Sequence, residues 1–361
     1  MEDYEKELIE NGLHSIDLSE LHSLRNAGGS LGFPELTPEQ MTEKLLRGDA
    51  IWDPEQFHDS ILSILWGEVQ DAASVGIQMV AICILVGMLE HLSNSFGGKT
   101  VSRIGSMICS CAIAALCLSQ FGQVYKICSG TAEMLSFIMT VLLPVLLPLL
   151  IAVGGPAAGG TLHPLILTSV TLFSALIKKM ILPCMFFSGI LFLTNSLTQK
   201  GNLKKLSVLL RNAGIFITGL AVTLFSGLTE LQNIVSASAD GMLAKTVRYS
   251  ADHFIPIIGR FAADSLDLVI SCVSMIKSSV GLIGIILILS VLLIPILKIL
   301  AIALIFKLTA ILTEPLGNPS LSDCMDELGT TMLFMMAILL LTGILFLLFL
   351  TILIHIGNVS R

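Results

Sequence analysis

Residues 331–354 read TMLFMMAILLLTGILFLLFLTILI, a stretch of 24 residues without a charged side chain. A helix needs about 20 apolar residues to cross the roughly 30 Å hydrocarbon core of a bilayer. Six further stretches of this kind predict membrane spans near 75–92, 104–121, 135–153, 180–197, 212–235 and 280–297. Only 13% of the chain is charged and 54% is hydrophobic, whereas soluble domains are about 25% charged. Composition therefore excludes an ordinary soluble domain, a disordered chain and a nucleic-acid-binding domain.

Two other apolar stretches set the expected number of membrane segments at about seven to nine. Residues 165–177 are too short to cross comfortably and are followed at once by Lys178 and Lys179, so a broken or partly interfacial segment is expected there. Residues 299–312 can simply continue the preceding helix. The predicted fold is an all-α, polytopic membrane protein.

Charge is unevenly distributed along the chain. Residues 1–72 contain 16 acidic and four basic side chains, although the whole chain has a net charge of only −7. We expect these residues to form a small acidic region of short amphipathic helices. The first residues lack the apolar core of a signal peptide, so none is predicted in the sequence as it stands.

Basic residues in short hairpins predict the orientation in the membrane. The hairpins 93–103 and 198–211 contain six Lys and Arg residues between them, which predicts that both are cytoplasmic. One crossing back from the first hairpin places the acidic region 1–72 outside the cytoplasm. The third hairpin, 313–328, fits this rule poorly because it carries four acidic residues and no Lys or Arg.

Internal repetition suggests how the body is organised. At an offset of 108 residues, Arg103 aligns with Arg211 and Pro148 with Pro256. At an offset of 115, Gly214 aligns with Gly329. We infer parallel repeats of a helix–hairpin–helix unit. The expected division is the acidic region 1–72, repeat unit one at 73–179, repeat unit two at 180–294, and a partial third unit at 295–361.

Catalytic signals are nearly absent from the sequence. It contains no metalloprotease, nucleophile-elbow, phosphate-loop or dinucleotide motif, and we predict no catalytic, cofactor-binding or metal-binding residues.

Proline lacks the N–H that closes a helical turn, and unwound backbone at membrane depth must face protein or water. The sequence therefore offers a candidate broken-helix path, with a surface loop after a kinked span as the alternative. The residues of this path are Pro144, Pro148, Gly154, Gly155, Pro156, Gly159, Gly160, Pro164 and Pro256.

Lysines near the ends of apolar stretches allow two interpretations. They could mark a path for anions, or they could extend toward lipid headgroups. These lysines are Lys178, Lys179, Lys277, Lys298 and Lys307.

Several short segments, together with the overall layout, resemble a known family. LSNSFGG at 92–98, VLLPVLLP at 141–148, GGPAA at 154–158 and PIIGR at 256–260 are similar to the stage III sporulation protein AE family of endospore-forming bacteria. Members typically begin with a signal sequence, whereas none is predicted in this sequence as it stands.

The resemblance implies a role in sporulation. The implied role is a non-enzymatic multi-pass subunit of a secretion-like channel complex that links mother cell and forespore and is needed for late forespore gene expression. It places the chain in the mother-cell membrane around the forespore. The implied partners are other proteins of the stage III sporulation A operon, namely a secretion-type ATPase and ring-forming proteins, with a forespore-side protein as a further candidate. The lipid bilayer and a homo-oligomer also fit, whereas nucleic acid and cofactors are not expected. The alternative is an autonomous secondary transporter with its substrate path at the Pro/Gly-broken helices.

Overall fold

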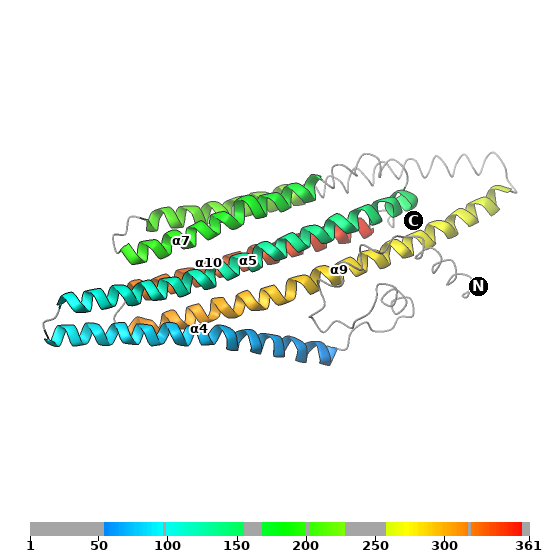
Figure 1. Ribbon diagram of the computed structural model, residues 1–361. Helices are drawn as coiled ribbons and strands as arrows, with labels where there is room; N and C mark the ends of the chain where they lie inside the picture. Colours follow the sequence, from blue (N-terminus) through cyan, green and yellow to red (C-terminus); the bar gives the residue numbers. More distant parts are fainter. Residues whose placement is uncertain are drawn as a thin grey trace.

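The computed structural model in Figure 1 describes residues 54–96, 99–154, 168–198, 203–227, 258–316 and 319–355. All elements in these ranges are helical: α4 (Pro54–Phe96), α5 (Lys99–Gly154), the Thr168–Thr198 helix with its π turn η1 (Ile177–Ile181) and its last part α7 (Leu182–Thr198), the Lys204–Gly227 helix, α9 (Ile258–Thr313), the 3₁₀ turn η2 (Glu314–Leu316) and α10 (Pro319–His355). Six of these helices are long and apolar enough to cross a membrane. The predicted all-α, multi-pass membrane fold is confirmed.

The helices are longer and fewer than the hydropathy pattern predicts. The expected spans 104–121 and 135–153 both lie in α5, a continuous helix of 56 residues and about 84 Å. The polar segment between them contains no proline, so nothing interrupts the i→i−4 hydrogen bonds. The described part of the chain thus has six such helices where seven to nine membrane segments are expected.

The helix boundaries correct the expectation for residues 165–177 and confirm the one for residues 299–312. Residues 165–177 were expected to form a broken or interfacial segment, but their described part is continuous with the next helix. The irregularity takes the form of a π turn at the two lysines. Residues 299–312 continue the preceding helix to Thr313, as the sequence allows.

The six helices form three hairpins whose tips lie at the same end of the bundle. In Figure 1 the tips of α4–α5, of the Thr168–Thr198 and Lys204–Gly227 helices, and of α9–α10 all lie at the left. This arrangement is what parallel helix–hairpin–helix units would produce, although the repeat itself and the four-part division remain predictions. Residues 1–53, most of the expected acidic region, lie outside the described residues, and 54–72 form the first part of α4.

Polar contacts close the second hairpin and join it to the third. Ser188 and Ser207 each donate a hydroxyl hydrogen bond to the other's carbonyl, both at 2.8 Å. Ser196 of α7 donates to the carbonyl of Ser320 in α10 at 2.8 Å. Arg211 forms an ion pair with Glu327 of α10. An acidic side chain of the third hairpin therefore pairs with a basic one of the second.

A close helix crossing fixes the position of the Thr168–Thr198 helix on α5. A Cβ added at Gly189 would overlap the ring of Phe121. That ring is buried and stacks on Phe186 with centroids 5.6 Å apart, so it has little room to move. Glycine at 189 thus permits the two helices to approach.

We expect Gly189→Ala to destabilise the fold by about 1–3 kcal/mol, the usual cost of overpacking a filled core. Gly219 is the matched control, because it also lies in a helix but has nothing within 4 Å of an added Cβ. Gly219→Ala should be neutral or stabilise by up to about 1 kcal/mol, the difference in helix propensity. Thermal unfolding of the purified protein in detergent measures both. Equal effects of the two substitutions would contradict the described crossing.

Candidate functional site

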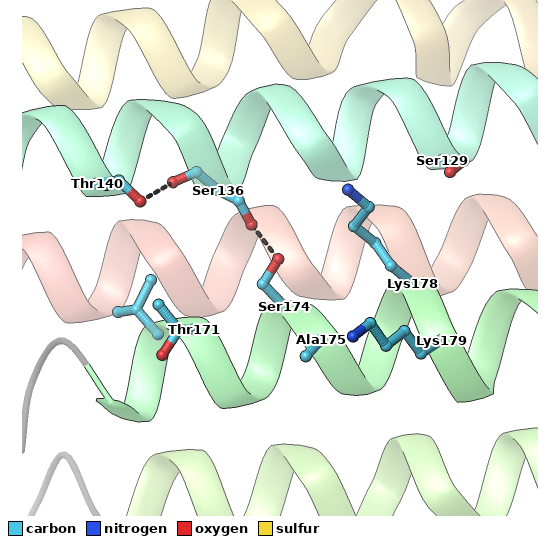
Figure 2. Close-up of a pocket in the computed structure, with 9 residues that line it drawn as sticks. Ser129, Ser136, Thr140, Thr171, Ser174, Ala175, Lys178 and Lys179 are labelled. Atoms are coloured by element: carbon cyan, nitrogen blue, oxygen red, sulfur yellow. Dashed lines mark hydrogen bonds between the residues drawn. The ribbon is translucent and has the colours of Figure 1, made fainter.

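A half-open cavity of about 380 Å³ lies between α5 and the Thr168–Thr198 helix (Figure 2). Its wall combines two lysines and five hydroxyl side chains with two small apolar residues. The lining residues are Ser129, Ser136, Thr140, Val170, Thr171, Ser174, Ala175, Lys178 and Lys179.

Helical spacing brings the hydroxyl groups to the cavity. Ser129, Ser136 and Thr140 follow one another at seven and four residues on α5, and such intervals keep side chains on one face of a helix. The hydroxyls of Ser136 and Ser174 hydrogen-bond to each other across the two helices. Thr140 donates to the carbonyl of Ser136 at 2.9 Å. The Ser136–Ser174 bond joins the two walls between the lysines and the Thr140 end of the cavity, whereas the Thr140 bond stays within α5.

The lysines enter the cavity from the π turn. In this turn the N–H of Leu182 donates to the carbonyl of Ile177, five residues back, and such π turns are frequent at functional sites. The cavity is lined by both Lys178 and Lys179, although they are adjacent in sequence. Lys178 extends toward α5 (Figure 2). Its ammonium group donates to Glu133 Oε1 at 2.9 Å.

Contacts to α10 give the depth of the lysines in the bundle. Phe173 packs against Phe346 of α10 with ring centroids 5.9 Å apart. The two helices run in opposite directions, so Lys178 lies about 7.5 Å nearer the hairpin tips and level with Leu341. Leu341 is the middle of 328–354, a stretch of α10 without Asp, Glu, Lys or Arg. Each end of this stretch is about 20 Å away, which is farther than a lysine side chain reaches.

The exposed face of α5 is polar beside the cavity. Ser119, Gln123, Lys126, Gly130 and Glu133 are all exposed and follow one another at intervals of three or four residues, which places them on one line along the helix. A charged side chain at the centre of a bilayer costs roughly 2.5–3.5 kcal/mol or more. This face is therefore suited to water or to another protein and poorly suited to lipid.

The sequence-predicted path residues are only partly described. Pro144 and Pro148 lie in α5 with exposed side chains, and the helix continues through both. Pro144 cannot donate an N–H to the carbonyl of Thr140, one turn back, and Thr140 lines the cavity. Gly154 is the last residue of α5. The other path residues lie outside the described residues: Gly155, Pro156, Gly159, Gly160, Pro164 and Pro256.

The five lysines considered from the sequence have different surroundings. Lys298 pairs with Glu68 of α4 at 3.0 Å, and Lys307 pairs with Asp326 of α10 at 2.7 Å, so both join helices. Lys277 is fully buried in α9. Lys178 and Lys179 are the pair that shares a cavity, so the alternative of an anion path applies best to them.

Sequence reasoning missed the hydroxyl residues and Glu133. A usable signal was present, because Glu133 is the single acidic residue between Glu90 and Glu230 and lies among apolar stretches. In the described ranges no group of three or more His, Cys, Asp or Glu side chains is placed to hold a metal ion. The cavity supplies cationic and hydroxyl groups, which suit binding of a polar solute.

Comparisons with known proteins give one consistent result. A family model described as stage III sporulation protein AE matches residues 36–357. A relative from Bacillus subtilis (strain 168), named "Stage III sporulation protein AE", is 28% identical over 328 residues. The match covers 90% of this chain and 82% of the relative. No solved structure matches.

Proposed function

The chain belongs to the stage III sporulation protein AE family, and we propose that this sporulation membrane protein is a non-enzymatic subunit that lines a passage for polar solutes in a channel complex between mother cell and forespore. One observation carries the proposal. A cavity lined by two lysines and five hydroxyls lies between two helices, and the helix rise from the Phe173–Phe346 contact places it level with the middle of a 27-residue stretch of α10 without Asp, Glu, Lys or Arg.

The chemistry of the cavity supports a passage over a purely anchoring role. Apolar helices alone would hold a membrane anchor in place, and ionisable residues inside a membrane commonly mark a path for ions or substrates. Lys178, Lys179 and Glu133 are such residues, and the exposed polar line on α5 leads toward them from the hairpin tips.

The placement in the cell follows from charge. Lys204 and Lys205 are exposed near the hairpin tips, and basic residues favour the cytoplasmic side. We place the tips in the mother-cell cytoplasm and the start of α4, with the acidic residues before it, between the two membranes. On this orientation the proposed partners are a secretion-type ATPase at the tips and ring-forming proteins at the opposite end, with a forespore-side protein beyond.

Crosslinking in sporulating cells tests the assignment. A photo-reactive residue at exposed Lys126, on the polar line of α5, should capture other proteins of the stage III sporulation A operon, because that face is suited to a protein or to water. The matched control is a photo-reactive residue at Leu220, an exposed apolar position on the Lys204–Gly227 helix, which should give fewer protein adducts. Recovery of no operon protein from Lys126 would contradict the proposed role.

The autonomous transporter is the second candidate, and the same cavity supports it. The two functions differ in what the purified chain does alone. A transporter moves a solute in proteoliposomes without partners, whereas a channel subunit is inert until its partners are added. Transport by the chain alone would favour the second candidate.

A further inference from the structure

We propose that the cavity between α5 and the Thr168–Thr198 helix is a binding site for a small, water-soluble oxyanion, held by Lys178 and Lys179 and by the hydroxyl groups of the wall. The inference deepens the proposed function and rests on it for its role in the cell, because it names the class of solute that the passage would select.

The charges of the site favour an anion. Two lysines line the cavity, and no acidic residue does. Glu133 is the one described carboxylate that pairs with either of them, so a net positive charge remains. Ammonium and hydroxyl groups are the donors that phosphate and carboxylate oxygens accept from, and charge-assisted hydrogen bonds are about twice as strong as neutral ones.

The arrangement of donors suits an oxyanion with several oxygens. Ser136 and Ser174 meet between the lysines and the Thr140 end of the cavity, and Lys178 and Lys179 lie about one turn further along the helix of Ser174. Lys178 is held by Glu133 at 2.9 Å, and the Glu133 side chain is 69% exposed. An arriving anion can therefore replace Glu133 as the partner of Lys178 while water solvates the released carboxylate. Glu133 is a competitor for the site on this account.

Size and depth separate a free anion from a lipid headgroup. The volume of about 380 Å³ lies near the lower end of the range for small-molecule sites, roughly 300–1,000 Å³. The lysines lie about 20 Å from either end of the uncharged stretch of α10, which is too deep for the headgroup of a bilayer lipid. The shared chemistry is an oxyanion, and the source that the depth favours is the aqueous phase.

Binding of inorganic phosphate to the purified full chain tests the proposal. The readout is broadening of the phosphorus NMR line of phosphate as protein in neutral detergent is added. Lys178→Gln and Lys179→Gln should each weaken binding about tenfold, the factor expected when one charge-assisted hydrogen bond is lost. Glu133→Gln should tighten binding by removing the competitor. Lys205→Gln, an exposed lysine near the hairpin tips, should leave binding unchanged.

The opposite effects of the lysine and glutamate variants distinguish binding from a general loss of structure, because a misfolded protein would not bind more tightly. Absence of phosphate binding to the unaltered chain, or equal binding by Lys179→Gln, would overturn the proposal. Competition by phosphatidylglycerol added to the micelles would overturn the choice of a free anion, whereas unchanged phosphate binding supports it. If phosphate does not bind but crosslinking from Lys126 recovers the operon partners, the proposed function stands without the anion site. If phosphate binds but crosslinking recovers no operon partner, only the anion site stands.

Discussion

Reversing the charge of Arg211 by Arg211→Glu is expected to prevent the chain from accumulating as a folded membrane protein. Arg211, on the Lys204–Gly227 helix, pairs with Glu327 of α10, and their side chains are only 17% and 22% exposed. The guanidinium also lies 5.8 Å from the centroid of the Phe334 ring, a cation–π contact. Removing one partner of a buried ion pair costs about 3–5 kcal/mol, and total stabilities are only about 5–15 kcal/mol. A second acidic group beside Glu327 adds repulsion.

The reciprocal exchange provides the matched control. Arg211→Glu combined with Glu327→Arg restores opposite charges and should recover most of the lost protein. Asp326→Asn removes the partner of Lys307, but that aspartate is 52% exposed, and exposed pairs contribute about 0–1 kcal/mol. It should therefore have little effect. Size-exclusion profiles of detergent-extracted protein measure all three variants. Normal accumulation of Arg211→Glu alone would show that the pair does not hold the second and third hairpins together.

The ion pairs of the third hairpin show what the preference of basic loops for the cytoplasm can and cannot predict from sequence. The third hairpin fits the rule poorly because its acidic residues were weighed alone. In the fold, Glu327 and Asp326 face Arg211 and Lys307 from other helices. The partners are separated by 116 and 19 residues. Only the packed bundle reveals that these acidic side chains are matched by basic ones.

Hydropathy predicted that the chain is a helical membrane protein because every stretch that crosses hydrocarbon must be apolar along its length. Hydropathy divided α5 wrongly because it treats any polar segment between two apolar stretches as a connection. The residues between 121 and 135 are polar enough to look like a connection, but a helix breaks when backbone hydrogen bonds fail, and this segment has no proline to remove one. Its polarity instead marks an exposed face, including Gln123, Lys126 and Glu133.

The candidate site was predictable only in fragments. Lys178 and Lys179 stood out because two adjacent lysines interrupt an apolar stretch. The serines and threonines did not, since they change mean hydropathy little and are common in membrane helices. The contact between Lys178 and Glu133 joins residues 45 positions apart, and no local pattern encodes it. Pro144 and Pro148 lie on α5 beyond Thr140, but the helix passes through them and neither lines the cavity.

The labelling of a cysteine in the cavity should differ sharply from that of a cysteine facing lipid at the same depth. Ala175 lines the cavity and lies two residues from Phe173. Phe173 contacts Phe225, with centroids 4.7 Å apart, and the neighbouring Leu224 is 56% exposed on the Lys204–Gly227 helix. Ala175→Cys and Leu224→Cys therefore report on two surroundings at closely similar depth.

The background must be free of reactive native thiols. All eight cysteines are free, and four of them, Cys83, Cys117, Cys128 and Cys324, are buried. The other four are changed to alanine: Cys109, Cys111, Cys184 and Cys272.

Labelling of these two variants in intact membranes with a charged, membrane-impermeant maleimide shows whether the cavity holds water at membrane depth. A thiol must ionise to react, and ionisation requires water. The account predicts rapid labelling of Ala175→Cys and almost none of Leu224→Cys. If Ala175→Cys is as unreactive as Leu224→Cys, the cavity is closed to water and the passage proposed here does not run through it.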